Sequence, residues 1–182
     1  MLLKKIMTME QYIDSVRHPL YKPFSELYHT SFPVFEQRSA GQQEEAFRSQ
    51  EYRLQAFTEG PAFIGFISFW EFGTYIYVEH FAINKELRGQ GHGSRILRKF
   101  LESTEKTVIL KIDPVIDEVS MARLSFYLRC GFHENPYQHR HPAYDPTYSP
   151  HPLEILSAPR AISPIEYEAF RNDLCSIVMR QH

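Results

Sequence analysis

The hydrophobic pattern of this 182-residue chain changes its period at one glycine-rich segment, Arg88-Gly89-Gln90-Gly91-His92-Gly93. Before it, residues 52–83 hold three β-prone runs separated by short turns that contain Gly60 and Gly73. Such runs predict an antiparallel meander. After it, apolar residues recur at helical spacing over residues 93–103. The glycine-rich segment is therefore expected to join the last strand of the meander to a helix.

The remaining segments extend this order and predict a mixed α/β (α+β) fold in a single domain over residues 1–182. A stretch rich in His, Pro and Tyr, residues 133–152, is expected to be a long ordered loop within that domain. Further strands are predicted at residues 6–8, 107–112 and 153–156, and helices at 9–16, 24–28, 44–47, 121–128 and 163–179.

Composition and charge narrow the class of protein. Hydrophobic residues make up 43% and charged residues 23%, which is ordinary for a globular domain. The net charge of −2 offers no basic field for a nucleic acid. No run approaches the roughly 20 apolar residues that span a bilayer, and Cys130 and Cys175 fit no metal or redox spacing. A cytoplasmic protein with free thiols and no membrane or nucleic-acid partner is expected.

The chemistry of the glycine-rich segment favours an anion site. Glycine has no Cβ, so backbone amides can approach an anion closely, and the helix that follows adds unpaired N–H groups and a partial positive charge. Arg88 and Arg95 could add charged contacts, and a diphosphate fits such a site best. The alternative is a tight turn with no ligand. The Lys-Ser/Thr pair of a P-loop and the dinucleotide glycine pattern are both missing.

Two motifs make the chain similar to the GNAT superfamily of N-acetyltransferases. Arg88, Gly91 and Gly93 fill the fixed positions of its cofactor-loop motif, Arg/Gln-x-x-Gly-x-Gly/Ala. Residues 126–132, Phe-Tyr-Leu-Arg-Cys-Gly-Phe, resemble its Tyr-x-x-x-Gly-Phe signature. The resemblance covers about residues 50–135. It implies acetyl-CoA as co-substrate and a twisted, mostly antiparallel sheet of six to seven strands with helices on both faces.

The resemblance also implies roles for individual residues. Tyr127 would protonate the departing thiolate, a task that suits a phenol neutral at pH 7. Ser120 and Arg123 stand where many members have Asn and a small residue, so their cofactor contacts depart from the common pattern. The implied cofactor-binding residues are Phe81, Ala82 and Ile83 for the pantetheine arm, Arg88, Gly89, Gln90, Gly91, His92, Gly93 and Ser94 for the pyrophosphate, and Ser120 and Arg123.

Glu79 is the first candidate for the general base. Strand alternation places Tyr77, Glu79 and Phe81 on one face and His80 on the other, which ranks His80 second despite its closer intrinsic pKa. Several members of the GNAT superfamily have a base at the position that corresponds to Glu79, or two residues earlier, where this chain has Tyr77. The alternative for Glu79 is a salt bridge or a substrate anchor without proton transfer.

These observations predict an acyltransferase that moves an acetyl group from acetyl-CoA to a primary amine of a small molecule, by direct attack in a ternary complex. The alternatives are a non-catalytic acyl-CoA-binding module and a protein or peptide N-acetyltransferase. No metal is expected, and both monomer and homodimer stay open. Three tyrosines of the expected loop at residues 133–152, here called the late loop, could line the acceptor cleft, and packing within the loop explains them equally well. Those tyrosines are Tyr137, Tyr144 and Tyr148. The same stretch holds four histidines that are not expected to bind zinc: His133, His139, His141 and His151.

Overall fold

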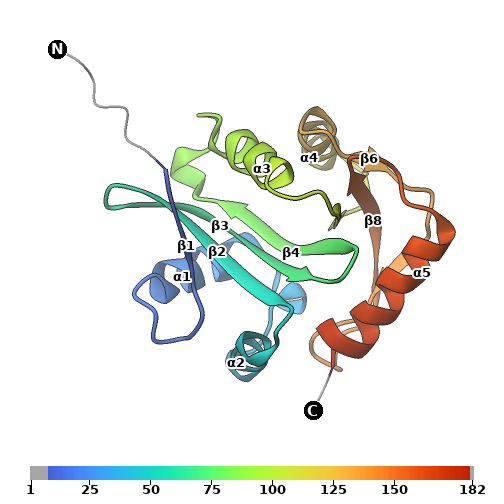
Figure 1. Ribbon diagram of the computed structural model, residues 1–182, viewed down its shortest axis with the longest axis horizontal. Coiled ribbons are helices and arrows are strands. Elements are labelled where there is room, and N and C mark those ends of the chain that lie inside the picture. The colour runs from blue at the N-terminus through green and yellow to red at the C-terminus, as the bar shows by residue number, and fades with distance from the viewer. Residues whose placement is uncertain (1–7, 181–182) are drawn as a thin grey trace.

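The computed structural model describes residues 8–180 and places helices on both faces of one open sheet (Figure 1). Ile6 and Met7, two of the three residues of the first expected strand, lie outside that range. The elements are β1 (Met9–Tyr12), α1 (Tyr21–Ser31), η1 (Val34–Glu36), α2 (Ala40–Arg48), β2 (Tyr52–Glu59), β3 (Ala62–Glu71), β4 (Tyr75–Ile83), η2 (Lys85–Leu87), α3 (His92–Glu102), β5 (Thr107–Ile112), α4 (Glu118–Arg129), β6 (His133–Glu134), β7 (His139–His141), β8 (His151–Ala158), α5 (Pro164–Asp173) and η3 (Leu174–Val178).

The sheet has eight strands in the order β1-β2-β3-β4-β5-β8-β6, and β7 pairs with β8 beside this path. Neighbouring strands are antiparallel except β4 and β5, which run parallel because α3 crosses between them. The predicted fold class and the meander of β2, β3 and β4 are confirmed. The strand count exceeds six to seven because β6 and β7 are very short strands within the stretch expected to be a loop.

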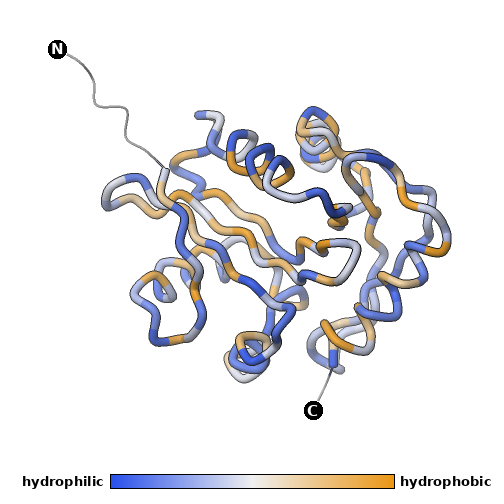
Figure 2. Tube along the Cα trace, in the orientation of Figure 1, coloured by the Kyte–Doolittle hydropathy of each residue, from blue (hydrophilic) through white to orange (hydrophobic). Residues whose placement is uncertain are grey.

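Two hydrophobic cores lie on opposite faces of the sheet. α1, α2 and α5 cover one face, where Phe24, Phe66 and Phe170 are fully buried. α3 and α4 cover the other, where Leu97 and Tyr127 pack against β4 and β5. The longest hydrophobic stretches of the trace lie in the central strands (Figure 2), which fits strands buried from both sides.

The prediction of a helix over residues 9–16 is wrong. Met9–Tyr12 is an edge strand, and all four of its residues are exposed while they pair with residues 55–58 of β2. An exposed edge strand needs no alternation of apolar and polar side chains, so backbone pairing with β2 decides its structure. The expected helix at 163–179 begins at its capping box on Ser163, and its last turn is a π-helix.

Candidate functional site

The site lies where β4 and β5 separate. Their parallel pairing runs from Tyr75 beside Thr107 to Val78 beside Leu110 and then ends. Beyond that point β4 pairs only with β3, and β5 only with β8, among the residues that the structure describes. The free edge of β4 over residues 79–83 faces a cavity of about 660 Å³. This edge offers unpaired backbone groups to an extended ligand.

A β-bulge coincides with this separation. Ser68 of β3 pairs with His80 and Phe69 pairs with Val78, which leaves Glu79 as an extra residue in β4. A bulge bends its strand and increases the local twist. The separation of β4 from β5 therefore begins at the bulged residue.

The glycine-rich segment forms the other wall of the cavity. Gly89 and Gly91 have φ angles of +75° and +79°, a left-handed conformation that side chains other than glycine adopt at a cost. Gly91 is the N-cap of α3 and supplies no side-chain cap. The first intrahelical hydrogen bond runs from the Arg95 amide to the Gly91 carbonyl. The first amides of α3 therefore remain available to an anion.

Gly93 allows α3 to pack closely at this point. A Cβ atom added there would lie 3.4 Å from Cγ1 of Ile83 and 3.5 Å from Cζ of Phe126. The helix N-terminus thus sits directly against β4 and α4, beside the free strand edge.

Most of the predicted cofactor residues line this one cavity. Two do not: Gln90 donates to the Glu86 carbonyl, and Ser120 belongs to the capping box of α4 with Asp117. The Arg88 guanidinium donates to the Ile83 carbonyl at 3.1 Å, and Arg123 is paired with Asp113. The predicted residues that line the cavity are Glu79, Phe81, Ala82, Ile83, Arg88, Gly89, Gly91, His92, Gly93, Ser94, Arg123 and Tyr127.

Tyr127 projects from α4 toward the cavity and is almost entirely buried. Its ring packs edge-on against Phe126 and Phe132. Burial raises the pKa of its hydroxyl to about 12, so the phenol keeps its proton at neutral pH. No hydrogen-bond partner for this hydroxyl lies within residues 8–180. The group is neutral and holds a proton that it could donate.

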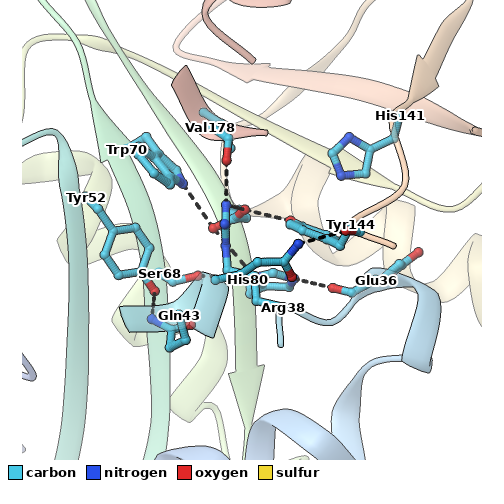
Figure 3. A network of polar contacts seen from close by, with 12 residues as sticks. Glu36, Arg38, Gln43, Tyr52, Ser68, Trp70, His80, His141, Tyr144 and Val178 are labelled. Carbon is cyan, nitrogen blue, oxygen red and sulfur yellow. Dashed lines mark hydrogen bonds and ion pairs between the residues drawn. The ribbon is translucent and has the colours of Figure 1, made fainter. Parts of the chain in front are cut away.

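Glu79 lies in a buried polar network, with only 1% of its side chain exposed. Its carboxylate accepts hydrogen bonds from Nη2 of Arg38 at 2.7 Å, Nε1 of Trp70 at 3.0 Å and the hydroxyl of Tyr144 at 2.6 Å. Burial alone would raise its pKa, but the charge and hydrogen bonds of Arg38 dominate and hold the pKa at about 2. Figure 3 shows Trp70 and Tyr144 on opposite sides of this network. The geometry is that of an ion pair rather than of a free base.

The predicted separation of Glu79 and His80 onto opposite faces is wrong, because the bulge interrupts the alternation. Glu79 contacts Trp70, and Nδ1 of His80 lies 3.4 Å from the Ser68 hydroxyl. Ser68 and Trp70 are two residues apart on β3 and therefore share a face. Burial lowers the pKa of His80 to about 4, so this imidazole is neutral at pH 7.

Several residues of the cavity and of the Glu79 network carried no signal in the sequence. Arg38 reaches the network from the segment between η1 and α2, and it also donates to the Val178 carbonyl at 2.9 Å. Glu36 and Lys111 line the end of the cavity beyond Glu79. Of the three late-loop tyrosines, Tyr144 alone lines the cavity.

Three of the four histidines in residues 133–151 lie near one another, with ring centroids 6.4 Å apart for His139 and His141 and 5.6 Å apart for His141 and His151. Nδ1 of His139 contacts the Tyr167 hydroxyl, Nδ1 of His141 accepts from Lys111, and His133 is exposed on β6. Over residues 8–180, no three His, Cys, Asp or Glu side chains are grouped as metal ligands would be. In the same range no helix combines the length and the apolar character that crossing a bilayer requires.

Comparison with known proteins gives matches to one family. The sequence pattern of the acetyltransferase (GNAT) family matches residues 20–132. A Bacillus subtilis (strain 168) protein named "Putative acetyltransferase YjbC" is 32% identical over 103 residues, which cover 56% of this chain and 52% of that protein. The matched part thus spans about half the length of this relative.

Solved structures share the fold. A GNAT-family structure from Bacteroides thetaiotaomicron superposes with a TM-score of 0.88 at 28% identity, over 96% of this chain and 99% of that one. A GNAT-family acetyltransferase from Elizabethkingia anophelis with acetyl-CoA bound has a TM-score of 0.58 at 12% identity. That match covers 85% of this chain and 98% of the other.

Proposed function

This chain belongs to the acetyltransferase (GNAT) family, and on that premise we propose that it transfers an acetyl group from acetyl-CoA to a primary amine of a small molecule. The observation that carries this proposal is the free edge of β4, which borders one continuous cavity with the uncapped N-terminus of α3 and with Tyr127. That cavity offers backbone partners for a pantetheine arm, amides for a diphosphate and, in Tyr127, a proton donor.

The donor side follows from these elements. Backbone groups of Phe81 and Ile83 would bind the pantetheine arm as an added strand. Amides at the start of α3 would bind the pyrophosphate, and the left-handed glycines let them approach it closely. Solved relatives with CoA or acetyl-CoA bound support this assignment. Arg123, which shares the cavity, is paired with Asp113, so its contact with a phosphate would require exchange of that partner.

The transfer is proposed to proceed by direct attack of the amine on the thioester carbonyl. A backbone N–H of the free β4 edge would polarise this carbonyl as an oxyanion hole does. The C–N bond forms as the C–S bond breaks, and Tyr127 supplies the proton that the thiolate takes. Glu79 is assigned a positioning role, because its acceptor capacity is occupied by Arg38, Trp70 and Tyr144.

The test combines CoA binding with CoA release. Calorimetric titration with CoA and a thiol-release assay would be run against spermidine, glycine, kanamycin and a short peptide. We expect Tyr127→Phe to lower kcat at least tenfold with an unchanged Kd for CoA. Tyr12→Phe, on the exposed edge strand β1, serves as the control.

The outcomes separate the alternatives. Tight CoA binding without thiol release for any amine would indicate a non-catalytic acyl-CoA-binding module. Release with the peptide alone would indicate a peptide N-acetyltransferase. Equal turnover of wild type and Tyr127→Phe would remove Tyr127 from the acid role.

A further inference from the structure

A second carboxylate lies at the far end of the cavity. Glu36 ends the short helix η1 and lines the cavity together with Lys111, His141 and Tyr144. Figure 3 shows Glu36 and His141 on the Tyr144 side of the network, away from Trp70. The glycine-rich segment lines the same cavity, so a cofactor bound by that segment would share the cavity with an acceptor bound at Glu36.

Glu36 differs from Glu79 in what its oxygens contact. The Glu79 carboxylate accepts three hydrogen bonds from buried donors. Within the described part of the chain the Glu36 carboxylate accepts none, and Nε2 of the His151 imidazole lies 3.3 Å from it. Its side chain is 18% exposed. A half-buried carboxylate without strong internal donors can accept a hydrogen bond from a ligand.

The backbone of η1 is fixed in place around this side chain. The Glu36 carbonyl lies 3.0 Å from Nε2 of His80, the residue next to the β4 bulge. The ring of Phe35 packs edge-on against His151. The segment that carries this carboxylate is therefore held by contacts from both β4 and β8, as the support of a preorganised binding group should be.

Charged neighbours face Glu36 from several elements. Burial and, to a lesser extent, the charge of Asp113 raise its pKa to about 7, although Lys111 and Arg123 act to lower it. Lys111 has its own pKa lowered to about 7, chiefly by burial, and its Nζ donates to Nδ1 of His141 at 2.8 Å. Burial also lowers the pKa of the surrounding imidazoles, so they are mostly neutral at pH 7: His80, His141 and His151.

We propose that the Glu36 carboxylate binds the ammonium group of the acceptor and takes the proton that the amine must lose before it attacks. This inference rests on the proposed acetyl transfer. The first proton passes from the ammonium to Glu36 and then to water. The neutral amine attacks, the C–N bond forms and the C–S bond breaks. Tyr127 gives its proton to the thiolate. The second proton of the nitrogen then leaves and passes through water to Tyr127, which is thereby reprotonated. The products are the amide, CoA thiol and one released proton.

The experiment measures kcat/KM for the best amine of the panel from pH 5.5 to 9, with CoA affinity measured in parallel. The variants are Glu36→Gln, Glu36→Asp and Lys111→Met. Glu168→Gln, which removes an exposed carboxylate paired with Arg171 on the distant α5, is the matched control. Thermal unfolding of each variant checks that the fold is retained.

We expect Glu36→Gln to lower kcat/KM about 100-fold while the Kd for CoA stays within twofold. In the wild type, kcat/KM should fall as the pH drops below about 7, because Glu36 takes up a proton there. This acid limb of the pH profile should vanish in Glu36→Gln and return in Glu36→Asp. In Lys111→Met it should persist and move to higher pH, because Lys111 stabilises the ionised carboxylate. A purely structural role of Glu36 would not move this limb.

Two results would overturn the inference. If wild type turns over and Glu36→Gln retains both its rate and its acid limb, Glu36 is not the proton acceptor, and acetyl transfer itself stands. If wild type binds CoA and releases no thiol with any amine, the proposed function fails and the role of Glu36 falls with it.

Discussion

The Tyr144 hydroxyl donates a 2.6 Å hydrogen bond to the carboxylate of Glu79, which lies 65 positions earlier in the chain. The contact joins the segment between β7 and β8 to the bulge of β4, beside the point where β4 and β5 separate. The guanidinium of Arg38 lies 5.0 Å from the centroid of the Tyr144 ring, so the same side chain covers both partners of the ion pair.

Tyr144→Phe should destabilise the protein by about 2 kcal/mol, because it removes a donor from a buried charge and leaves the ring in place. Urea unfolding at pH 7 measures this change. Tyr148→Phe, on the same loop and 40% exposed, should change the free energy of unfolding by less than about 0.5 kcal/mol. Equal effects of the two variants would contradict the importance of the Tyr144–Glu79 contact.

The depressed pKa of Glu79 predicts a dependence of stability on pH. The folded protein keeps Glu79 ionised down to about pH 2, whereas an unfolded glutamate takes up a proton near pH 4. The stabilisation is therefore complete above about pH 4.5 and is lost as the pH falls toward 2. Its size is about 3 kcal/mol, and urea unfolding at several acidic pH values measures it.

Variants at both partners check the origin of this loss. Glu79→Gln should cost about 3–5 kcal/mol at pH 7, because it leaves Arg38 charged, buried and uncompensated. The double variant Arg38→Met with Glu79→Gln should recover part of that stability and show a flatter curve below pH 4.5. A double variant as unstable as the single one would contradict a charge-pair origin.

The sequence predicted the parts of the site that rest on local chemistry. The glycine-rich segment lies between β4 and α3 as its period change indicated, and Tyr127 and Gly131 fall on α4 and just beyond it. Glycine conformation, helix capping and apolar spacing act over a few residues, so one segment of sequence carries them.

The part of the cavity around Glu36 and the buried Glu79 network could not be predicted in this way. Glu36 and Arg38 come from a segment with no periodic pattern, and only tertiary packing brings them to β4. Tyr144 was one of three tyrosines suggested for an acceptor cleft, and no local pattern distinguished it from the other two. The bulge was missed for a related reason. Nothing in residues 75–83 marks an extra residue, because the register between Ser68 and His80 is decided by pairing with β3.

Gly91→Ala should weaken CoA binding and lower stability. Its φ of +79° lies in the left-handed region, where an alanine costs about 1–2 kcal/mol. Relief of that strain would turn the amides at the start of α3 away from the pyrophosphate, so the Kd for CoA should rise about tenfold. Titration calorimetry and thermal unfolding measure the two effects.

Gly41→Ala is the control for this substitution. Gly41 lies in α2, its added Cβ would meet nothing within 4 Å, and its φ is not left-handed. An alanine there should stabilise the helix by up to about 1 kcal/mol and leave CoA affinity unchanged. A Gly91→Ala variant with wild-type affinity would remove the α3 N-terminus from the proposed pyrophosphate site.

Gly65 tests whether the close pairing of β3 with β4 maintains the free strand edge. A Cβ atom at Gly65 would lie 2.3 Å from the carbonyl oxygen of Ala82 and 3.2 Å from Cα of Ile83. Backbone atoms cannot move aside as a flexible side chain can, so Gly65→Ala must push β4 away from β3. We expect a loss of about 1–3 kcal/mol in unfolding free energy. Since the displaced residues 82 and 83 belong to the proposed pantetheine edge, CoA affinity should fall as well. A stable Gly65→Ala variant with unchanged CoA affinity would show that this edge does not bind the cofactor arm.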